Sequence, residues 1–164
     1  MLVYYFVEVP RSFEDAESVL FKLLDGLSEA ADIAYREGEE LRAQLGLHAP
    51  GFHKTVRMDI GEALHREDQT TIPLRWEATG ATGLFPTMLA DLTLARLGPR
   101  ITQLAFSGSY DPPLGAVGLA LDRTLHRIAE ATVKRFTDRL ASSLVAWPPS
   151  MPLAATRGAD TAAP

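Results

Sequence analysis

The chain has 164 residues, of which 46% are hydrophobic and 23% are charged, and its formal net charge is −5. This length and balance are typical of one globular domain with its own core. The Lys and Arg residues form no basic stripe, so nucleic acid is not an expected partner. The lack of cysteine excludes disulfides, thiolate metal sites and cysteine nucleophiles, and it is compatible with a reducing, cytoplasmic location.

The first apolar segment, LVYYFVEV at residues 2–9, predicts a β-strand that ends at Pro10. It does not resemble a signal peptide, because it is too short, lacks a basic start, and is interrupted by Glu8. No apolar run approaches the ~18 residues of a membrane span, so no membrane insertion is expected.

Two helices are predicted next. In the first, apolar residues recur at helical spacing from Phe13 to Leu24, Ser12 is the expected N-cap, and Gly26 is the expected end. The second, at about 27–45, has a thin apolar side. That thin side suggests a mobile lid over a cavity entrance.

Apolar and polar residues then alternate in four segments. This alternation predicts four strands, at about 54–62, 70–80, 87–95 and 100–110. The connections HREDQ, GATG and LGPR are typical of turns, so the strands should form an antiparallel meander with one covered face. Pro73 lies inside the second strand and is expected at an edge, at a bulge or among the first pairs of the strand.

Helical spacing returns from about Pro113 to Leu144. The predicted rod is roughly 45 Å long and is the only element expected to be long enough to cover the sheet. Its apolar stripe comprises Val117, Leu121, Leu125, Ile128, Thr132, Phe136, Leu140 and Leu144. Residues 1–146 are the predicted domain, and 147–164 a Pro- and Ala-rich tail.

Gly115 and Gly118 lie at the predicted start of this helix, where each costs about 1 kcal/mol relative to alanine. A close approach of strand and helix would explain them. The alternative is an ordered loop before the helix.

Two segments carry a family resemblance, PLRWEATGATGLFPTMLADLTL and TQLAFSGSYDPPLGAVGLALDRTLHRIAEATVKRF. Over about residues 2–145 the chain resembles the START-like (SRPBCC) superfamily. The resemblance implies an α+β helix-grip fold, in which a curved antiparallel sheet wraps around a long C-terminal helix. It also implies a cavity between the two. Members of the superfamily bind lipids, sterols, hormones or polyketides, and others are enzymes such as polyketide cyclases, or cochaperones.

The inward-facing residues of the strands and the last helix are the expected cavity lining, although they could equally fill a solid core. They are Val56, Met58, Leu74, Trp76, Met88, Leu92, Leu104, Phe106, Leu125 and Phe136.

Asp122 and His126 are four apart on the last helix, so an acid and an imidazole share one face and could form a general base. The alternative is a surface ion-pair lattice with Arg123, Arg127 and Glu130. Tyr110 ends the preceding strand and either presents its hydroxyl to a ligand or caps the core. No histidine pair has metal-ligand spacing, and neither a metal nor another cofactor is expected.

Three functions are therefore compatible with the sequence. The first is binding of an apolar or amphipathic, lipid- or polyketide-like molecule. The second is a cyclase, aromatase or dehydratase that uses the same cavity. The third is an interaction module without a ligand, with a homodimer through an exposed sheet edge as one form of it.

Overall fold

The computed structural model describes residues 1–148 apart from 28, 32, 35–55, 79–86 and 111–118, and it describes the backbone alone at 56, 78, 119–125 and 128. The strands are β1 (Leu2–Val9), β2 (Val56–Ile60), β3 (Leu64–Arg66), β4 (Gln69–Ala78), β5 (Met88–Gly98) and β6 (Ile101–Tyr110). The helices are α1 (Phe13–Leu23), the short 3-10 turn η1 (Leu24–Gly26) and α3 (Leu119–Ala146). Residues 27, 29–31 and 33–34 are also helical.

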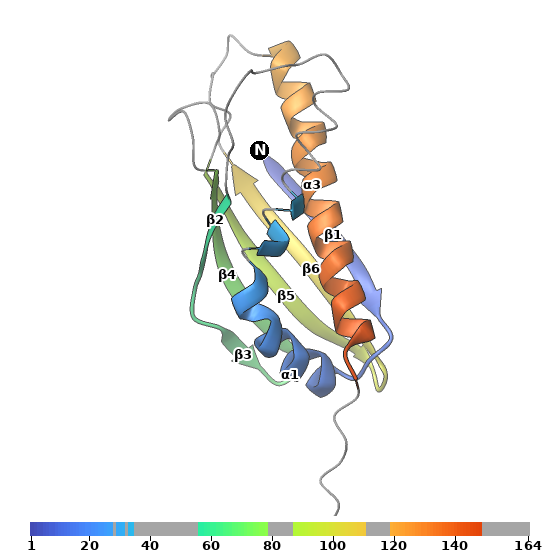
Figure 1. The fold of residues 1–164 in the computed structure, drawn as a ribbon. Helices are drawn as coiled ribbons and strands as arrows, with labels where there is room; N and C mark the ends of the chain where they lie inside the picture. Colours follow the sequence, from blue (N-terminus) through green and yellow to red (C-terminus); the bar gives the residue numbers. More distant parts are fainter. Residues whose placement is uncertain (28, 32, 35–55, 79–86, 111–118, 149–164) are drawn as a thin grey trace, which may run out of the picture.

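The strands form one antiparallel sheet in the order β1-β6-β5-β4-β2, with β3 paired to β4 beside β2. The first strand therefore pairs with the last one, Leu2 opposite Ser109 and Val9 opposite Thr102. The remaining strands follow chain order, as expected for a meander. Figure 1 shows the sheet curving around α3, so the predicted α+β helix-grip architecture is confirmed.

Pro73 lies opposite Asp91 of β5, at the point where the other side of β4 passes from β3 to β2. Its carbonyl accepts a hydrogen bond from Gly61 N at 2.7 Å on that side. A strand residue directs its N–H and C=O to the same side. The N–H that proline lacks would thus point toward Gly61, just beyond the last paired residue of β2, so its absence removes no hydrogen bond to β5.

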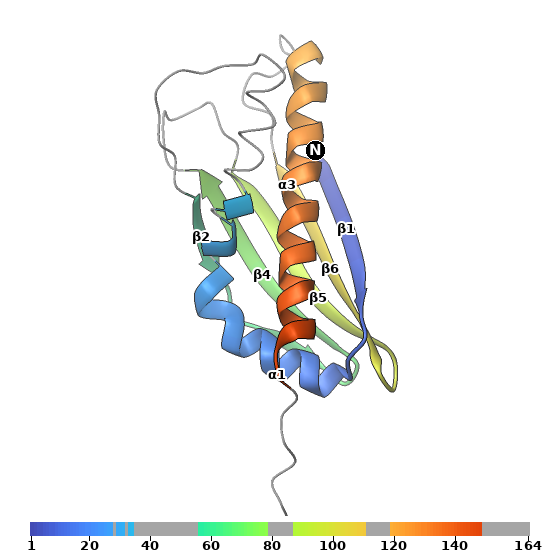
Figure 2. The ribbon, with the colours of Figure 1, turned by 45° about the vertical axis from the view of Figure 1, so that its right-hand side comes forward.

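Two helices, and not α3 alone, cover the concave face of the sheet. Figure 2 shows α3 passing in front of the sheet beside β1, while α1 crosses below β4 and β5. Phe13, Ala16, Val19 and Leu20 of α1 are buried, so its apolar side was correctly predicted. The expectation that the last helix covers the sheet by itself was wrong, because the short α1 closes the end that α3 leaves open.

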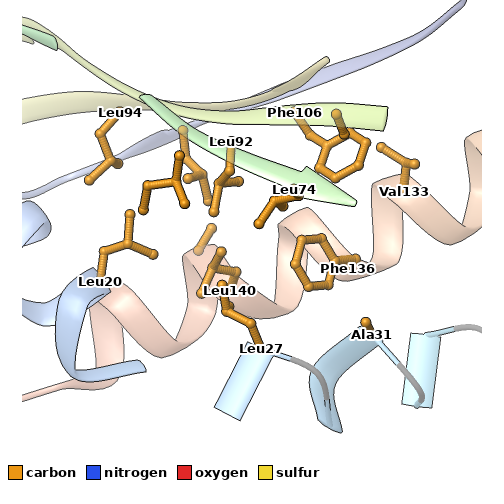
Figure 3. Close-up of a cluster of buried hydrophobic side chains, with 14 of the residues drawn as sticks. Leu20, Leu27, Ala31, Leu74, Leu92, Leu94, Phe106, Val133, Phe136 and Leu140 are labelled. Carbon is orange, nitrogen blue, oxygen red and sulfur yellow. The ribbon is translucent and has the colours of Figure 1, made fainter. Parts of the chain in front are cut away.

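The hydrophobic core lies between these helices and the sheet (Figure 3). The predicted α3 stripe is confirmed at Thr132, Phe136, Leu140 and Leu144, all buried. Leu27, Ala31 and Ala34 are buried in the same core, so the start of the predicted lid helix is anchored. The lid hypothesis for 35–45, the close-approach explanation of Gly115 and Gly118, and the tail from 149 onward lie outside the described residues.

Three polar side chains, Arg96, Tyr5 and Arg11, help to hold the helices in place. Arg96 of β5 reaches Glu14 of α1 and Asp68 of the β3–β4 turn, each at 2.6 Å. The Tyr5 hydroxyl of β1 donates to Asp138 of α3 at 2.8 Å. Arg11 donates to the carbonyls of Val145 and Trp147, where a cation stabilises the C-terminal end of α3.

Two predicted boundaries need correction. The segment HREDQ is not wholly a turn, because Leu64–Arg66 pairs with β4 as the short strand β3. The described part of the long helix begins at Leu119 and ends at Ala146, two residues beyond the predicted end.

Candidate functional site

The residues predicted to line a cavity lie on the concave face wherever their side chains are described. Met88 is half-buried. The other residues each have an exposed fraction of at most 7%; these are Met58, Leu74, Trp76, Leu92, Leu104, Phe106 and Phe136. Val56 lies in β2 and Leu125 in α3, and their side chains are outside the described set. Contact with a ligand stays a prediction for all of these residues.

An aromatic cluster joins the sheet to α3 in the middle of this face. The rings of Trp76, Phe106 and Phe136 meet edge to face, with centroids 5.4 to 6.3 Å apart. Such geometry favours each pair beyond the effect of burial alone. Between this cluster and α1 the space is filled by leucines of the core, among them Leu20, Leu94 and Leu140 (Figure 3).

On the other side of the aromatic cluster, toward the end of β6, the inner wall is built from smaller residues. Ala90 of β5 lies opposite Gly108 of β6, and Met88 lies opposite Tyr110. A Cβ on Gly108 would come within 2.8 Å of Met88 Sδ and 2.9 Å of Phe106 Cε1. Glycine at this position therefore lets the flexible Met88 side chain lie across β6.

Two of the three candidate catalytic residues come together at this end. The Tyr110 side chain is 4% exposed, and its hydroxyl lies 3.3 Å from His126 Nδ1 and 3.3 Å from Met1 Sδ. The other ring nitrogen of His126, Nε2, lies 3.3 Å from Glu130 Oε1. The third candidate, Asp122, is in α3, but its side chain is outside the described set.

We call Tyr110, His126 and Glu130 the relay cluster. A carboxylate beside Nε2 favours the tautomer that carries its proton there, which makes Nδ1 an acceptor that competes with Met1 Sδ for the proton of the Tyr110 hydroxyl. A proton can then pass between the phenol and the imidazole. His126 is about one third exposed and Glu130 more than half, so the cluster runs from the buried face to solvent.

A second polar cluster was missed by the sequence analysis. Thr70 of β4 is fully buried and donates its hydroxyl to Glu17 of α1, while His65 Nδ1 lies 3.0 Å from the same carboxylate. The ring of Phe21 stacks on His65 at 5.5 Å. The partners are 48 and 53 residues apart in the chain, so no local pattern could have revealed them. Glu17 and Thr70 both lie near the same ring nitrogen of His65, Nδ1. This arrangement favours a structural role, in which the cluster holds α1 against β3, over a catalytic triad.

Two open grooves lie on the outside of the described molecule. One, of about 510 Å³, lies between residues 26–33 and the end of α3, including Ile33, Asp138 and Ser142. The other, of about 320 Å³, lies on the convex face of the sheet between Leu2, Pro73 and Leu89. Neither is lined by the aromatic cluster or by the relay cluster.

Within the described residues, no group of three His, Asp or Glu side chains is placed to hold a metal ion. No helix in that part of the chain combines the length and the hydropathy that a membrane crossing needs.

Comparisons with known proteins found structures of similar shape at low identity. No protein-family model and no curated protein matches the chain. A conserved protein from Geobacillus kaustophilus is 15% identical and covers 87% of this chain and 97% of its own, with a TM-score of 0.44. An aromatase/cyclase from Streptomyces sp. R1128 is 11% identical, covers 88% and 93%, and has a TM-score of 0.48.

Norcoclaurine synthase from Thalictrum flavum, solved with dopamine and hydroxybenzaldehyde, is 12% identical, covers 87% of each chain, and has a TM-score of 0.43. All of these likenesses are distant. The sheet order and the placement of α3 give this chain a helix-grip α+β architecture.

Proposed function

We propose that this protein binds an apolar or amphipathic small molecule, lipid-like or polyketide-like, between the concave face of the sheet and α3. The observation that carries the proposal is the composition of the wall beside the end of β6. Apolar Met88 lies opposite Tyr110 of the polar relay cluster there, and Trp76 lies opposite Met88 on its other side. Small-molecule sites are typically apolar with a few convergent polar groups, which is the combination found here.

The packing supports a ligand position at the end of the concave face that lies away from α1. The α1 end of the concave face is occupied by fully buried leucines, so no ligand is expected to bind there. The other end carries Ala90, Gly108 and the half-buried Met88, whose flexible thioether can move aside. Tyr110 would fix the orientation of the ligand, and apolar contact would supply about 25 cal/mol per Å² buried.

The direct test is native mass spectrometry of the protein purified from its own host, joined to a thermal-shift screen against lipids and polyketides. A co-purifying small molecule supports the proposal and identifies the class of ligand. If none co-purifies and no compound raises the melting temperature, the proposal fails and the ligand-free interaction module is the better function.

A matched pair of variants locates the site. Met88 and Leu89 are neighbours on β5, but Met88 faces α3 while Leu89 is 59% exposed on the convex face. With the amphipathic dye 1-anilinonaphthalene-8-sulfonate as the probe, Met88→Trp should weaken saturable binding about tenfold by filling the wall. Leu89→Trp should leave it unchanged, and equal effects of the two would place the dye elsewhere.

The relay cluster favours a second function, an enzyme of the cyclase, aromatase or dehydratase type. Such reactions begin when a base removes a proton next to a carbonyl group, and a phenol coupled to an imidazole can perform that step. Tyr110 would exchange the proton with the substrate, His126 would accept it through Nδ1, and Glu130 would stabilise the imidazolium.

Proton exchange measures this activity without the natural substrate. The probe is acetoacetyl-N-acetylcysteamine in deuterated buffer, followed by NMR. The protein should accelerate loss of the protons between its two carbonyls, and Tyr110→Phe should reduce that rate about 100-fold. Tyr4→Phe, on the convex face, is the control. No acceleration, or an unchanged rate in Tyr110→Phe, contradicts catalysis and leaves the binding proposal intact.

A further inference from the structure

The strand β1 has an unpaired edge. It is the end strand of the sheet, and among the described strands only β6 pairs with it. Its eight residues contain neither proline nor a positive charge. The opposite edge is different, because β2 has five residues and carries the exposed Arg57–Asp59 pair at 3.2 Å. Charged, short edges resist the addition of another strand, and long apolar ones invite it.

The hydrogen-bonding groups on this edge can be assigned. Met1 and Tyr110 exchange N–H to O bonds in both directions, so they form a hydrogen-bonded pair of the antiparallel ladder. Such pairs alternate along a strand. Val3, Tyr5 and Val7 therefore point their backbone groups at β6, and the residues between them point theirs away from the sheet; these are Leu2, Tyr4, Phe6 and Glu8.

The same alternate residues carry the apolar side chains of the convex face. Leu2, Tyr4 and Phe6 are 67%, 56% and 48% exposed, and the two rings lie 6.0 Å apart. Free backbone groups and exposed apolar side chains thus belong to one set of residues. Another antiparallel strand added here would form hydrogen bonds with the free backbone groups and would cover the exposed apolar side chains.

We propose that the partner is a second copy of this chain, joined β1 to β1 about a two-fold axis through Tyr5. This register pairs Tyr4 with Phe6 of the second copy, and Leu2 with Glu8 of the second copy. An isologous contact of this kind closes on itself, so it gives a dimer.

Charge complementarity on the concave side favours this register. Lys134 and Asp138 of α3 flank Tyr5: Lys134 Nζ lies 3.1 Å from its hydroxyl, and Asp138 accepts from that hydroxyl at 2.8 Å. Both charged side chains are roughly half exposed. The contacts of Tyr110 with His126, Tyr5 with Asp138 and Arg11 with Val145 show that α3 runs in the same direction as β1.

A two-fold axis through Tyr5 therefore makes the two α3 helices antiparallel. The ion pair that Lys134 and Asp138 form within each helix then lies beside its symmetry mate with the charges reversed, so opposite charges meet on both sides of the axis. The three apolar side chains bury on the order of 300 Å² per copy, below the ~800 Å² of a standard interface. The dimer should accordingly be weak and depend on concentration, with a dissociation constant in the micromolar range or above.

Sedimentation velocity over roughly 1–500 µM protein tests the proposal. The wild-type average mass should rise from the 17.9 kDa of the chain toward twice that value. Phe6→Lys should stay monomeric, because it puts a charge on the edge. Leu89→Lys, also at an exposed apolar position but two strands away from the edge, should behave as the wild type. A monomer at every concentration, or a dimer that Phe6→Lys leaves intact, overturns the proposal.

Cross-linking tests the register and does not depend on a disruptive variant. The chain has no cysteine, so one introduced thiol reports alone. Tyr5→Cys should oxidise to a disulfide dimer, because Cα atoms of a non-hydrogen-bonded antiparallel pair lie ~4.5 Å apart. Val7→Cys should not, since its symmetry mate would be roughly 13 Å away. Equal cross-linking of both variants, or of neither, contradicts the two-fold at Tyr5.

Discussion

Single side chains at the middle of the concave face determine how the sheet and α3 meet. Phe136 is fully buried and touches both Trp76 and Phe106 edge to face. Sequence periodicity placed Phe136 on the inward stripe, because it depends only on helical spacing. The ring-to-ring geometry depends on how three separate elements are packed, which no local pattern contains.

Phe136→Ala should lower the free energy of unfolding by about 3–5 kcal/mol, because it removes a buried ring and leaves a cavity beneath Trp76. Urea unfolding measures this value. Val145→Ala, at a position 49% exposed on the same helix, should change it by less than about 0.5 kcal/mol. Similar losses in the two variants would mean that the aromatic cluster is not the joint between sheet and α3.

Glu14 makes the stability depend on pH. Its hydrogen bond to Arg96 holds the pKa of this carboxyl below its ordinary value of 4.5. A carboxyl with a lowered pKa in the folded state binds fewer protons there than in the unfolded state. Its contribution is therefore complete above about pH 4.5 and is lost as the pH falls through the folded-state value.

In Glu14→Gln, the deficit in stability relative to the wild type should be present at pH 7 and shrink at pH 3, as measured by urea unfolding. Glu62→Gln, at an exposed position between β2 and β3, should show no such pH dependence. A deficit that stays constant over this range would mean that the ion pair with Arg96 does not stabilise the fold.

At the scale of elements, the sequence was most informative where a period was sustained. The bounds of β1 were predicted to the residue, and β2, β4, β5 and β6 were each recognised from their alternation. The three residues of β3 are all exposed, so they have no alternation to detect. The role of α1 as a second cover was also missed, since its position depends on Arg96 and Asp68, far away in the chain.

The candidate site was predicted in the same partial way. Tyr110 and His126 were named from their positions at the end of a strand and on a helix face. Their contact at 3.3 Å depends on the angle at which α3 crosses β6. The link from Glu130 to His126 is a helical neighbour contact, four residues along, and it belongs to the ion-pair alternative that spacing alone had offered.

The start of α1 offers a prediction at this scale. Asp15 N donates to Ser12 Oγ at 3.3 Å, which is the predicted N-cap contact. Ser12→Ala should therefore cost about 1 kcal/mol of stability. Ser12→Asp retains an acceptor oxygen and should cost much less, and calorimetry of both variants decides the point. If the two are equally destabilised, the hydroxyl does not cap the helix.

For the whole molecule, the sheet order predicts a gradient of protection. Amides of β6 lie between β1 and β5 against the buried face, whereas β3 pairs on one side with exposed side chains. Hydrogen exchange followed by mass spectrometry should find β6 among the slowest segments and β3 among the fastest. The helical residues 27, 29–31 and 33–34 should be intermediate, since Leu27, Ala31 and Ala34 are buried whereas Glu29 and Ile33 are exposed. A β3 as well protected as β6 would contradict the topology.

The pairing of β1 with β6 has a consequence for biosynthesis. Met1 and Tyr110 are separated by 109 positions, so a ribosome adding roughly 5–20 residues per second needs about 5–20 s between them. During this interval the strand that pairs with the nascent segment LVYYFVEV has not yet been synthesised. Holdase chaperones that recognise extended aromatic stretches are accordingly expected to engage it co-translationally, and faster elongation through the middle of the message would shorten that exposure.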